Sequence, residues 1–303
     1  MAVFQYKIGN LYIKINSCLD LSVLSLYKPF VSDFVPPKYD ISIDICQIRI
    51  EEIEEAYNKL SGNWNDKCTY AWVSKKDRHY MIFSKRSQRL CTAALTDIWI
   101  LDCNEGYSQC ILYVPFCASF AEAIHELSTR PWLQRLFLAY SCQANFVLCH
   151  GALVDIDGEG VIFLGDSGSG KSTLCDLLNT AKVTVIADDR FILDIAAGGA
   201  VGFGTPWNIK NPQYCKNSCS EIKKVFILSH GNNQLKDVGN NYHDMVYGVF
   251  PAMLFPSFMS LNKAVAKKIR YLNFIRTRCG IYSFAFKPDV SAISYIMEAR
   301  GRC

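Results

Sequence analysis

The first 128 residues of the chain alternate short apolar runs with polar positions. Examples are Tyr12–Ile15, Ile41–Ile48, Tyr80–Phe83 and Cys110–Val114, with turn-forming stretches such as Asn104-Glu105-Gly106 between them. Alternation with a period of two, bounded by Gly, Pro and Asn, predicts strands joined by short hairpins. We therefore expect residues 1–128 to form a β-rich, mostly antiparallel N-terminal domain, in which no recognisable catalytic grouping indicates a role.

Two details of this region can be checked against a structure. The segment Ile50–Leu60 fits either a helix or a polar extension of a strand, and its pattern leaves both open. Cys103 and Cys110 flank a predicted hairpin turn. We therefore expect these two cysteines to be cross-strand neighbours.

The pattern changes over residues 129–303, where longer apolar strands alternate with helical runs. A helix is expected over Trp132–Ala144, because Pro131 is a favourable first helical residue. The next expected strands are Phe146–His150, Gly151–Ile156 and Val161–Leu164. The turn Asp157-Gly158 predicts that these strands pair as a hairpin sheet. We expect a second domain over residues 129–303 and an α/β (α+β) fold class for the chain.

The composition is that of a soluble globular protein, with 50% apolar and 20% charged residues among 303. A net charge of +4 with scattered basic residues indicates neither a nucleic acid nor a membrane partner. Met1–Asn16 alternates like a strand rather than a signal peptide. No apolar run approaches the ~20 residues that span a bilayer. We therefore expect a cytoplasmic protein.

The 14 cysteines are spread through apolar segments, as buried thiols are, so we expect them to be reduced. Cys215 and Cys219 form a C-x₃-C pair. A structural zinc site usually has two paired ligands at each end. The second pair is missing nearby, which counts against zinc.

The clearest chemical signal is a glycine-rich loop between a strand and a helix. Gly165 to Ser172 matches the template G-x-x-x-x-G-K-[ST] of phosphate-binding loops in full. In such a loop, backbone N–H groups and the helix N-terminus hold an anionic polyphosphate. Lys171 would reach the outer phosphates, and the Ser172 hydroxyl would help to hold Mg²⁺. A plain Gly/Ser turn is the alternative, but the strand and helix that the motif requires are both predicted.

Two carboxylates follow the next apolar strand. Val183–Ala187 ends at Asp188 and Asp189, and the predicted hairpin Phe191–Ile195 and Val201–Phe203 comes after them. A nucleotide-binding fold places its second Mg²⁺ ligand at the end of such a strand. An acidic turn without function is the alternative. The position, one helix after a complete phosphate loop, favours the functional interpretation.

These residues resemble a known family. His150-Gly151-Ala152, Gly165–Ser172 and Ala187-Asp188-Asp189 look like the C-terminal kinase domain of HPr kinase/phosphorylase, over about residues 145–230. The resemblance implies a carboxykinase-like P-loop kinase core, related to phosphoenolpyruvate carboxykinase, that binds ATP and Mg²⁺. It implies a loop, from Gly165 to Thr173, that binds the nucleotide. The members of that loop are Gly165, Asp166, Ser167, Gly168, Ser169, Gly170, Lys171, Ser172 and Thr173.

The resemblance also implies individual roles. Lys171 would contact the β- and γ-phosphates, while Ser172 and Asp189 would hold the metal. Asp188 would take the proton from the acceptor hydroxyl, and His150 would position the acidic pair. Without the resemblance, His150 would be interpreted as a core histidine at a strand end.

Two departures from the family pattern change the expected activity. The bifunctional members have Glu after the loop's Lys-Ser, where this chain has Thr173, so a one-way kinase is expected. The loop that grips HPr is replaced by Asn211–Ser220, so HPr is not the expected acceptor. Before that point, Asn208 opens a segment, 208–220, that we expect to be a mobile loop beside the site.

The sequence therefore predicts an ATP- and Mg²⁺-dependent kinase. The acceptor would be a hydroxyl, expected on Ser or Thr of a peptide or protein, with a small hydroxyl metabolite as the alternative. A non-catalytic ATP-binding sensor or assembly protein and an ATP hydrolase are the rival functions. The family tends towards multimers, so a homo-oligomer is compatible with the resemblance.

Overall fold

The structure is a computed structural model, and it describes residues 2–17, 19, 21, 25–60, 70–75, 77–83, 98–115, 131–181, 183–195, 198–208, 211–239 and 241–300. It separates into two compact units, residues 1–140 and 141–303. The predicted boundary after residue 128 falls outside the described residues and stays a prediction. Each unit is built around one large mixed sheet, which confirms a mixed α/β protein.

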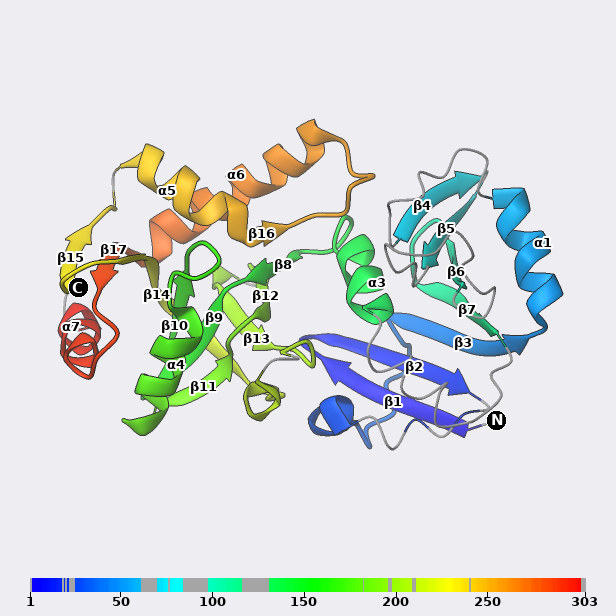
Figure 1. Cartoon of the computed structure of the whole chain (residues 1–303), viewed down its shortest axis with the longest axis horizontal. Helices are drawn as coiled ribbons and strands as arrows, with labels where there is room; N and C mark the ends of the chain where they lie inside the picture. Colours follow the sequence, from blue (N-terminus) through cyan, green and yellow to red (C-terminus); the bar gives the residue numbers. More distant parts are fainter. Residues whose placement is uncertain are drawn as a thin grey trace, which may run out of the picture. The chain divides into compact units, whose positions relative to one another are not determined.

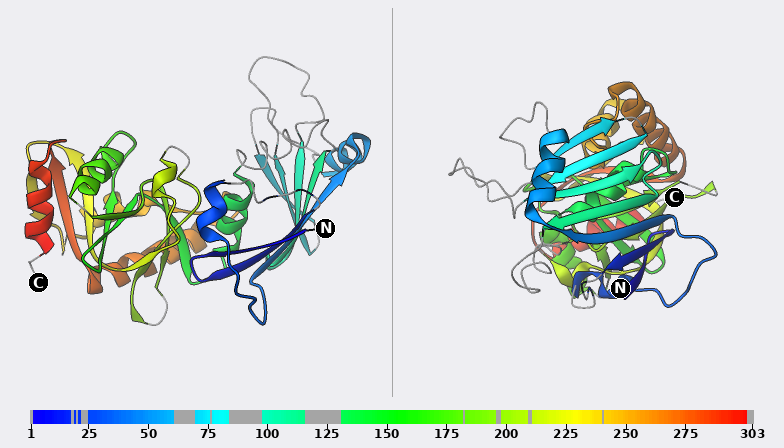
Figure 2. Two further views of the ribbon diagram at one scale, coloured as in Figure 1. Left: turned by 90° about the horizontal axis from the view of Figure 1, so that it is seen from below. Right: turned by 90° about the vertical axis from the view of Figure 1, so that its right-hand side faces the viewer.

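The strands described in the first unit form a sheet in the order β1-β2-β3-β7-β6-β5-β4. Their bounds are β1 Ala2–Ile8, β2 Leu11–Ser17, β3 Ile41–Ile48, β4 Tyr70–Lys75, β5 Arg78–Phe83, β6 Trp99–Asn104 and β7 Gln109–Pro115. The right-hand view of Figure 2 shows these strands side by side. The hairpin pairs are antiparallel as predicted, but β3 runs parallel to both β2 and β7.

Among its described residues, the first unit also contains the 3₁₀ turn η2 Ser25–Phe30 and the helices α1 Ile50–Leu60 and α3 Trp132–Tyr140. The ambiguous segment is therefore a helix. In this helix Ile53 packs with the sheet residues Ile82 and Ile100 in a buried cluster. Cys103 and Cys110 face each other across β6 and β7, as expected.

The strands described in the second unit form a mixed sheet in the order β11-β9-β10-β14-β13-β12-β8-β16, with β17 beside β14 and β15 beside β17. Their bounds are β8 Phe146–His150, β9 Ala152–Ile156, β10 Glu159–Leu164, β11 Thr184–Ala187, β12 Arg190–Asp194, β13 Val201–Gly204, β14 Cys219–His230, β15 Gln234–Asp237, β16 Met253–Leu254 and β17 Gly280–Phe286. β14 is parallel to β10 and to β17.

Helices cover both faces of this second sheet (Figure 1). On one face, α4 (Lys171–Thr180) and α7 (Ser291–Arg300) pack on the rings of Phe163, Phe226 and Phe284. On the other face, α5 (Tyr242–Val249) and α6 (Leu261–Arg278) pack on strand residues of opposite parity. Burying one such aromatic or aliphatic side chain stabilises the folded state by roughly 1.5–3 kcal/mol. Two short 3₁₀ turns, η5 (Pro212–Tyr214) and η6 (Phe250–Ala252), lie beside these elements.

The pairing of the strands before the phosphate loop differs in part from the prediction. β9 and β10 form the expected hairpin through Asp157 (φ 50°) and Gly158 (φ 85°), and β12 pairs with β13. β8, however, pairs with β12 and β16 rather than with β9. The chain changes course at Gly151, whose N–H donates to the Asp189 carbonyl (3.1 Å). This arrangement places His150 opposite Arg190.

Among the helices that the structure describes, none is both long and apolar enough to cross a membrane.

Candidate active site

The phosphate loop has the backbone that its glycines predict. At Gly165 φ is 151°, and at Gly170 φ is 91°, both in regions that favour glycine. A Cβ at Gly170 would also lie 2.5 Å from the Phe286 ring. Gly170 caps α4 without a side-chain hydrogen bond to the first helical turn. The N–H groups at the start of α4 therefore remain available to an anion.

Lys171 lies inside this loop. Its Nζ donates to the carbonyls of Gly165 (2.7 Å) and Asp166 (2.9 Å), and the side chain is almost fully buried. Burial lowers the pKa of Lys171, while the charges of Asp166 and Asp189 oppose that change. The ammonium group thus occupies the centre of the loop. Its nearest acceptors are uncharged carbonyls, and a bound phosphate would place a negative charge beside it.

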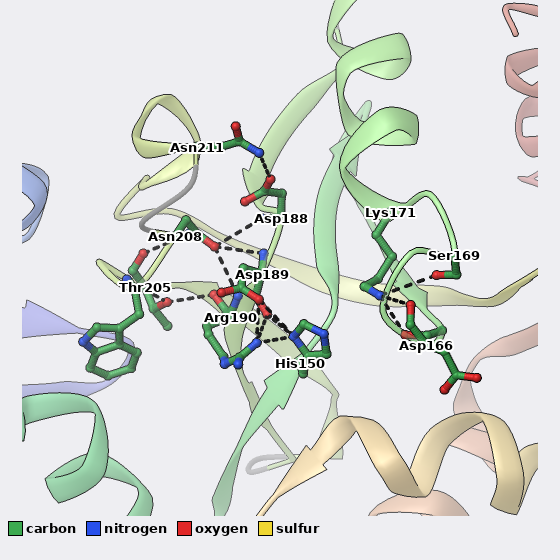
Figure 3. Close-up of polar contacts among 12 residues, drawn as sticks. His150, Asp166, Ser169, Lys171, Asp188, Asp189, Arg190, Thr205, Asn208 and Asn211 are labelled. Carbon is green, nitrogen blue, oxygen red and sulfur yellow. Dashed lines mark hydrogen bonds and ion pairs between the residues drawn. The ribbon is translucent and has the colours of Figure 1, made fainter. Parts of the chain in front are cut away.

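The two consecutive carboxylates point in different directions (Figure 3). Asp188 is buried, and its Oδ2 accepts a hydrogen bond from Asn211 Nδ2. Burial raises the pKa of Asp188, and the hydrogen bonds from Asn211 and from the nearby Ser172 hydroxyl lower it by less. Asp188 Oδ1 is buried without a hydrogen-bond partner. Asp188 therefore faces the helix that carries the loop's serine.

Asp189 faces the opposite way and forms a cluster with His150 and Arg190. Its Oδ1 lies 2.6 Å from Arg190 Nη1 and 3.0 Å from His150 Nδ1. Arg190 Nη1 also contacts His150 Nδ1. Asp189 thus forms an ion pair with Arg190, and His150 lies against the same carboxylate oxygen.

Asn208 fixes the turn that carries both carboxylates. Its Oδ1 accepts hydrogen bonds from the backbone N–H groups of three consecutive residues, Asp188 (3.3 Å), Asp189 (3.0 Å) and Arg190 (3.1 Å). Its Nδ2 donates to the carbonyls of Thr205 and Tyr214, both at 3.2 Å. Asn208 is fully buried. A single amide side chain thus accepts from the N–H groups of three consecutive residues of the carboxylate turn.

The segment after β13 is packed where the structure describes it. Tyr214 and Cys215 are buried, and the Tyr214 hydroxyl donates to Asp176 of α4 (2.7 Å). Asn211 reaches Asp188, so the segment does lie beside the site. The expectation of a mobile loop from Asn208 to Ser220 is wrong for these residues, because they connect the loop helix to the carboxylate turn.

Replacing Asn208 with alanine is expected to lower the free energy of unfolding by about 2–4 kcal/mol. The variant leaves buried N–H groups of the turn without an acceptor, and each unpaired group is costly. Denaturant unfolding measures the change, with Asn232→Ala, at an exposed turn position, as the matched control. Equal stability of the two variants would show that Asn208 does not hold the turn.

The stability of the ligand-free protein should depend on Asp188 and on pH. Burial raises the pKa of Asp188 above the ordinary value of about 3.9. The native state then holds a proton at pH values where the unfolded chain has lost it, so stability falls as pH rises through that range. Asp188→Asn should therefore be more stable than the wild type at neutral pH, and the difference should vanish below about pH 3.9.

Thermal unfolding across that pH range measures this difference. Asp237→Asn, on exposed β15, is the control because its replacement keeps an acceptor for the Gly239 N–H. An Asp188→Asn variant that is less stable than the wild type at neutral pH would mean that the native site stabilises the carboxylate.

The structure thus brings Ser172 to Asp188, and His150 to Asp189. Asn208, Asn211 and Arg190 were missed by the sequence interpretation. Arg190 directly follows the acidic pair, which is a local signal, but the roles of the two asparagines depend on tertiary contacts. Among the described residues, no three His, Cys, Asp or Glu side chains form a metal-binding group, at Cys215 and Cys219 or elsewhere.

Comparisons with known proteins add little to this geometry. No family model matches the sequence, and none of the curated proteins matches it. Among solved structures, the chain is similar to the Hpr(Ser) kinase/phosphatase from Coxiella burnetii, with 16% sequence identity over 42% of this chain and 94% of that chain, and a TM-score of 0.25. A TM-score this low does not establish a shared fold.

Proposed function

We propose that the second unit is a carboxykinase-like P-loop kinase core that transfers the γ-phosphoryl group of ATP to a hydroxyl with the help of Mg²⁺. The observation that carries this proposal is the division of the Asp188-Asp189 turn. One carboxylate faces the loop's serine, and the next faces His150 and Arg190. A protein that only binds nucleotide would need no second, separately oriented carboxylate.

The residues around Asp188 fit a magnesium ion. Mg²⁺ usually takes one or two protein oxygens together with phosphate oxygens and water. Asp188 Oδ1 is a buried carboxylate oxygen without a hydrogen-bond partner, and the Ser172 hydroxyl is next to the same carboxylate. These two side chains would hold the ion. When bound, Mg²⁺ neutralises charge on the β- and γ-phosphates and fixes their position.

The other groups of the site have separate tasks. The N–H groups at the start of α4 and the Lys171 ammonium bind the phosphates and stabilise the charge that the transferring group carries. Asp189 accepts the proton of the acceptor hydroxyl, with His150 next to it and Arg190 paired with it. Asn208 fixes the turn, so that both carboxylates keep their orientations.

This division differs from the one that the family resemblance implies, in which Asp188 is the base and Asp189 the metal ligand. The contact of Ser172 with Asp188, and the pairing of Asp189 with Arg190, favour the exchanged roles. The acceptor that we propose is Ser or Thr of a peptide or protein, with a small hydroxyl metabolite as the second class.

A transfer assay tests the proposed function. The full chain is incubated with Mg²⁺, γ-labelled ATP and a panel of Ser and Thr peptides, proteins and serine-like metabolites. We expect a mass gain of one phosphate on at least one class, and none when Mg²⁺ is chelated. Label that never leaves ATP in the presence of every class would contradict a kinase.

A further inference from the structure

A cavity of about 270 Å³ opens beside the phosphate loop in the second unit. One side consists of His150 and the first limb of the loop, Gly165–Ser167. The other side consists of the end of α5 and of η6, where Tyr247 and Pro251 lie. No role in the proposed nucleotide site uses the α5 side of this cavity.

The two sides of the cavity differ in chemistry. His150, Asp166 and Ser167 give polar groups at the loop side. At the other side, the aromatic ring of Tyr247 gives an apolar surface. Tyr247 lines the cavity and is 70% exposed, so its ring is accessible to a ligand. His243, one turn earlier in α5, packs against that ring with centroids 4.4 Å apart. A large aromatic surface facing a concave site is suited to bind a ligand group.

The close approach of α5 to the sheet forms this wall. A Cβ at Gly248 would lie only 2.4 Å from Ile227 Cδ1. A side chain at this position would force Ile227 to move, so glycine allows α5 to pack this closely against the end of β14. The neighbouring Tyr247 lines the same cavity as Gly165–Ser167 of the phosphate loop.

The size and position of the cavity indicate which part of a ligand it could hold. Its volume lies just below the ~300–1,000 Å³ of sites for drug-sized ligands, so it fits part of a molecule rather than a whole nucleotide. Lys171, Ser172 and Asp188 do not line it, whereas His150 does. The cavity thus adjoins His150, which lies next to the proposed base, as well as the first limb of the phosphate loop, but not the side chains proposed to hold the outer phosphates and the metal.

We propose that this cavity binds the phosphoryl acceptor, which is a Ser or Thr within a peptide segment whose neighbouring residue is aromatic or aliphatic. The hydroxyl lies at the His150 side, and the neighbouring side chain packs on Tyr247. This inference rests on the proposed kinase function and adds the class of its acceptor. Tyr247 selects the acceptor and takes no part in binding the nucleotide.

The test uses the full-length wild type, Tyr247→Ala and Tyr242→Ala. Tyr242 is also an exposed tyrosine of α5 but does not line the cavity, so it is the matched control. Each protein is titrated with MgATP, and each is assayed with γ-labelled ATP and a library of serine peptides randomised at the flanking positions. We expect the wild type to prefer aromatic or aliphatic residues beside the serine.

For Tyr247→Ala we expect the KM of the best peptide to rise at least ~10-fold, while the MgATP affinity changes less than about 2-fold. The flanking preference should also disappear, and Tyr242→Ala should behave as the wild type. A ~10-fold loss of MgATP affinity in Tyr247→Ala would instead make the cavity a nucleobase site and overturn the proposal.

Other outcomes separate this inference from the function on which it rests. Peptide phosphorylation without any flanking preference, or with the same preference in Tyr247→Ala, would overturn the inference alone. Phosphorylation of small hydroxyl compounds and of no peptide would do the same, and the kinase function would stand. Failure of every acceptor despite MgATP binding would overturn both.

Discussion

Replacing Lys171 with alanine is expected to weaken MgATP binding by at least about 100-fold and to abolish phosphoryl transfer. The ammonium group is buried at the centre of the loop, and its acceptors there are uncharged: the carbonyls of Gly165 and Asp166 and, at 3.5 Å, the Ser169 hydroxyl. Hydrogen bonds to charged groups are worth about 1.5–3 kcal/mol each, so losing the contacts to two phosphates gives an effect of this size. Calorimetric titration with MgATP measures it.

Lys236→Ala provides the matched control, because Lys236 is an exposed lysine of β15 in the same unit. Its affinity for MgATP should equal that of the wild type. An unchanged affinity in Lys171→Ala would remove the phosphate loop from the site, whatever its sequence suggests.

Replacing each of the two carboxylates should impair a different step, either phosphoryl transfer or MgATP binding. Asp189→Asn is expected to lower the transfer rate by about 10²–10⁴-fold, the usual range for a general base, while the MgATP affinity stays within about 3-fold of the wild type. Asp188→Asn is expected to remove the part of ATP binding that depends on Mg²⁺, because it replaces the carboxylate beside Ser172. Titrations with and without Mg²⁺, together with single-turnover rates, measure both.

A pH profile of the transfer rate distinguishes loss of a general base from a merely structural effect of the Asp189→Asn substitution. If Asp189 accepts the proton, its replacement should remove the acid limb of that profile. The reverse pattern, with Asp188→Asn binding MgATP normally but failing in transfer, would return the base to Asp188, as the family resemblance implies.

The sequence predicted those parts of the fold that depend on local signals. The Asp157-Gly158 turn predicted the β9–β10 hairpin, and the spacing of Cys103 and Cys110 predicted their cross-strand pairing. The phosphate loop could be located with its flanking strand and helix, since each glycine meets a need of the backbone. These features are fixed within about ten residues of chain, where turn chemistry and periodicity act.

The sequence did not predict features that depend on contacts between distant segments. β8 pairs with β12, forty residues further along, and this register alone sets His150 opposite Arg190. Asn208 lies in a polar, loop-like segment, so nothing local indicates that its amide is buried under the carboxylate turn. The orientation of Asp188 towards Ser172 likewise depends on tertiary contacts. Loop composition reports flexibility poorly when one side chain satisfies several backbone groups.

The fate of a labelled γ-phosphate in a single turnover tests the central claim most directly. Excess enzyme is mixed with Mg²⁺, γ-labelled ATP and the serine-peptide library, and the label is followed in peptide, inorganic phosphate and ATP. The proposed site predicts label in peptide, with Lys171→Ala and Asp189→Asn leaving it in ATP. Label that appears only in inorganic phosphate would indicate an ATP hydrolase, and label that stays bound as ATP would indicate a sensor; either result would contradict a hydroxyl kinase.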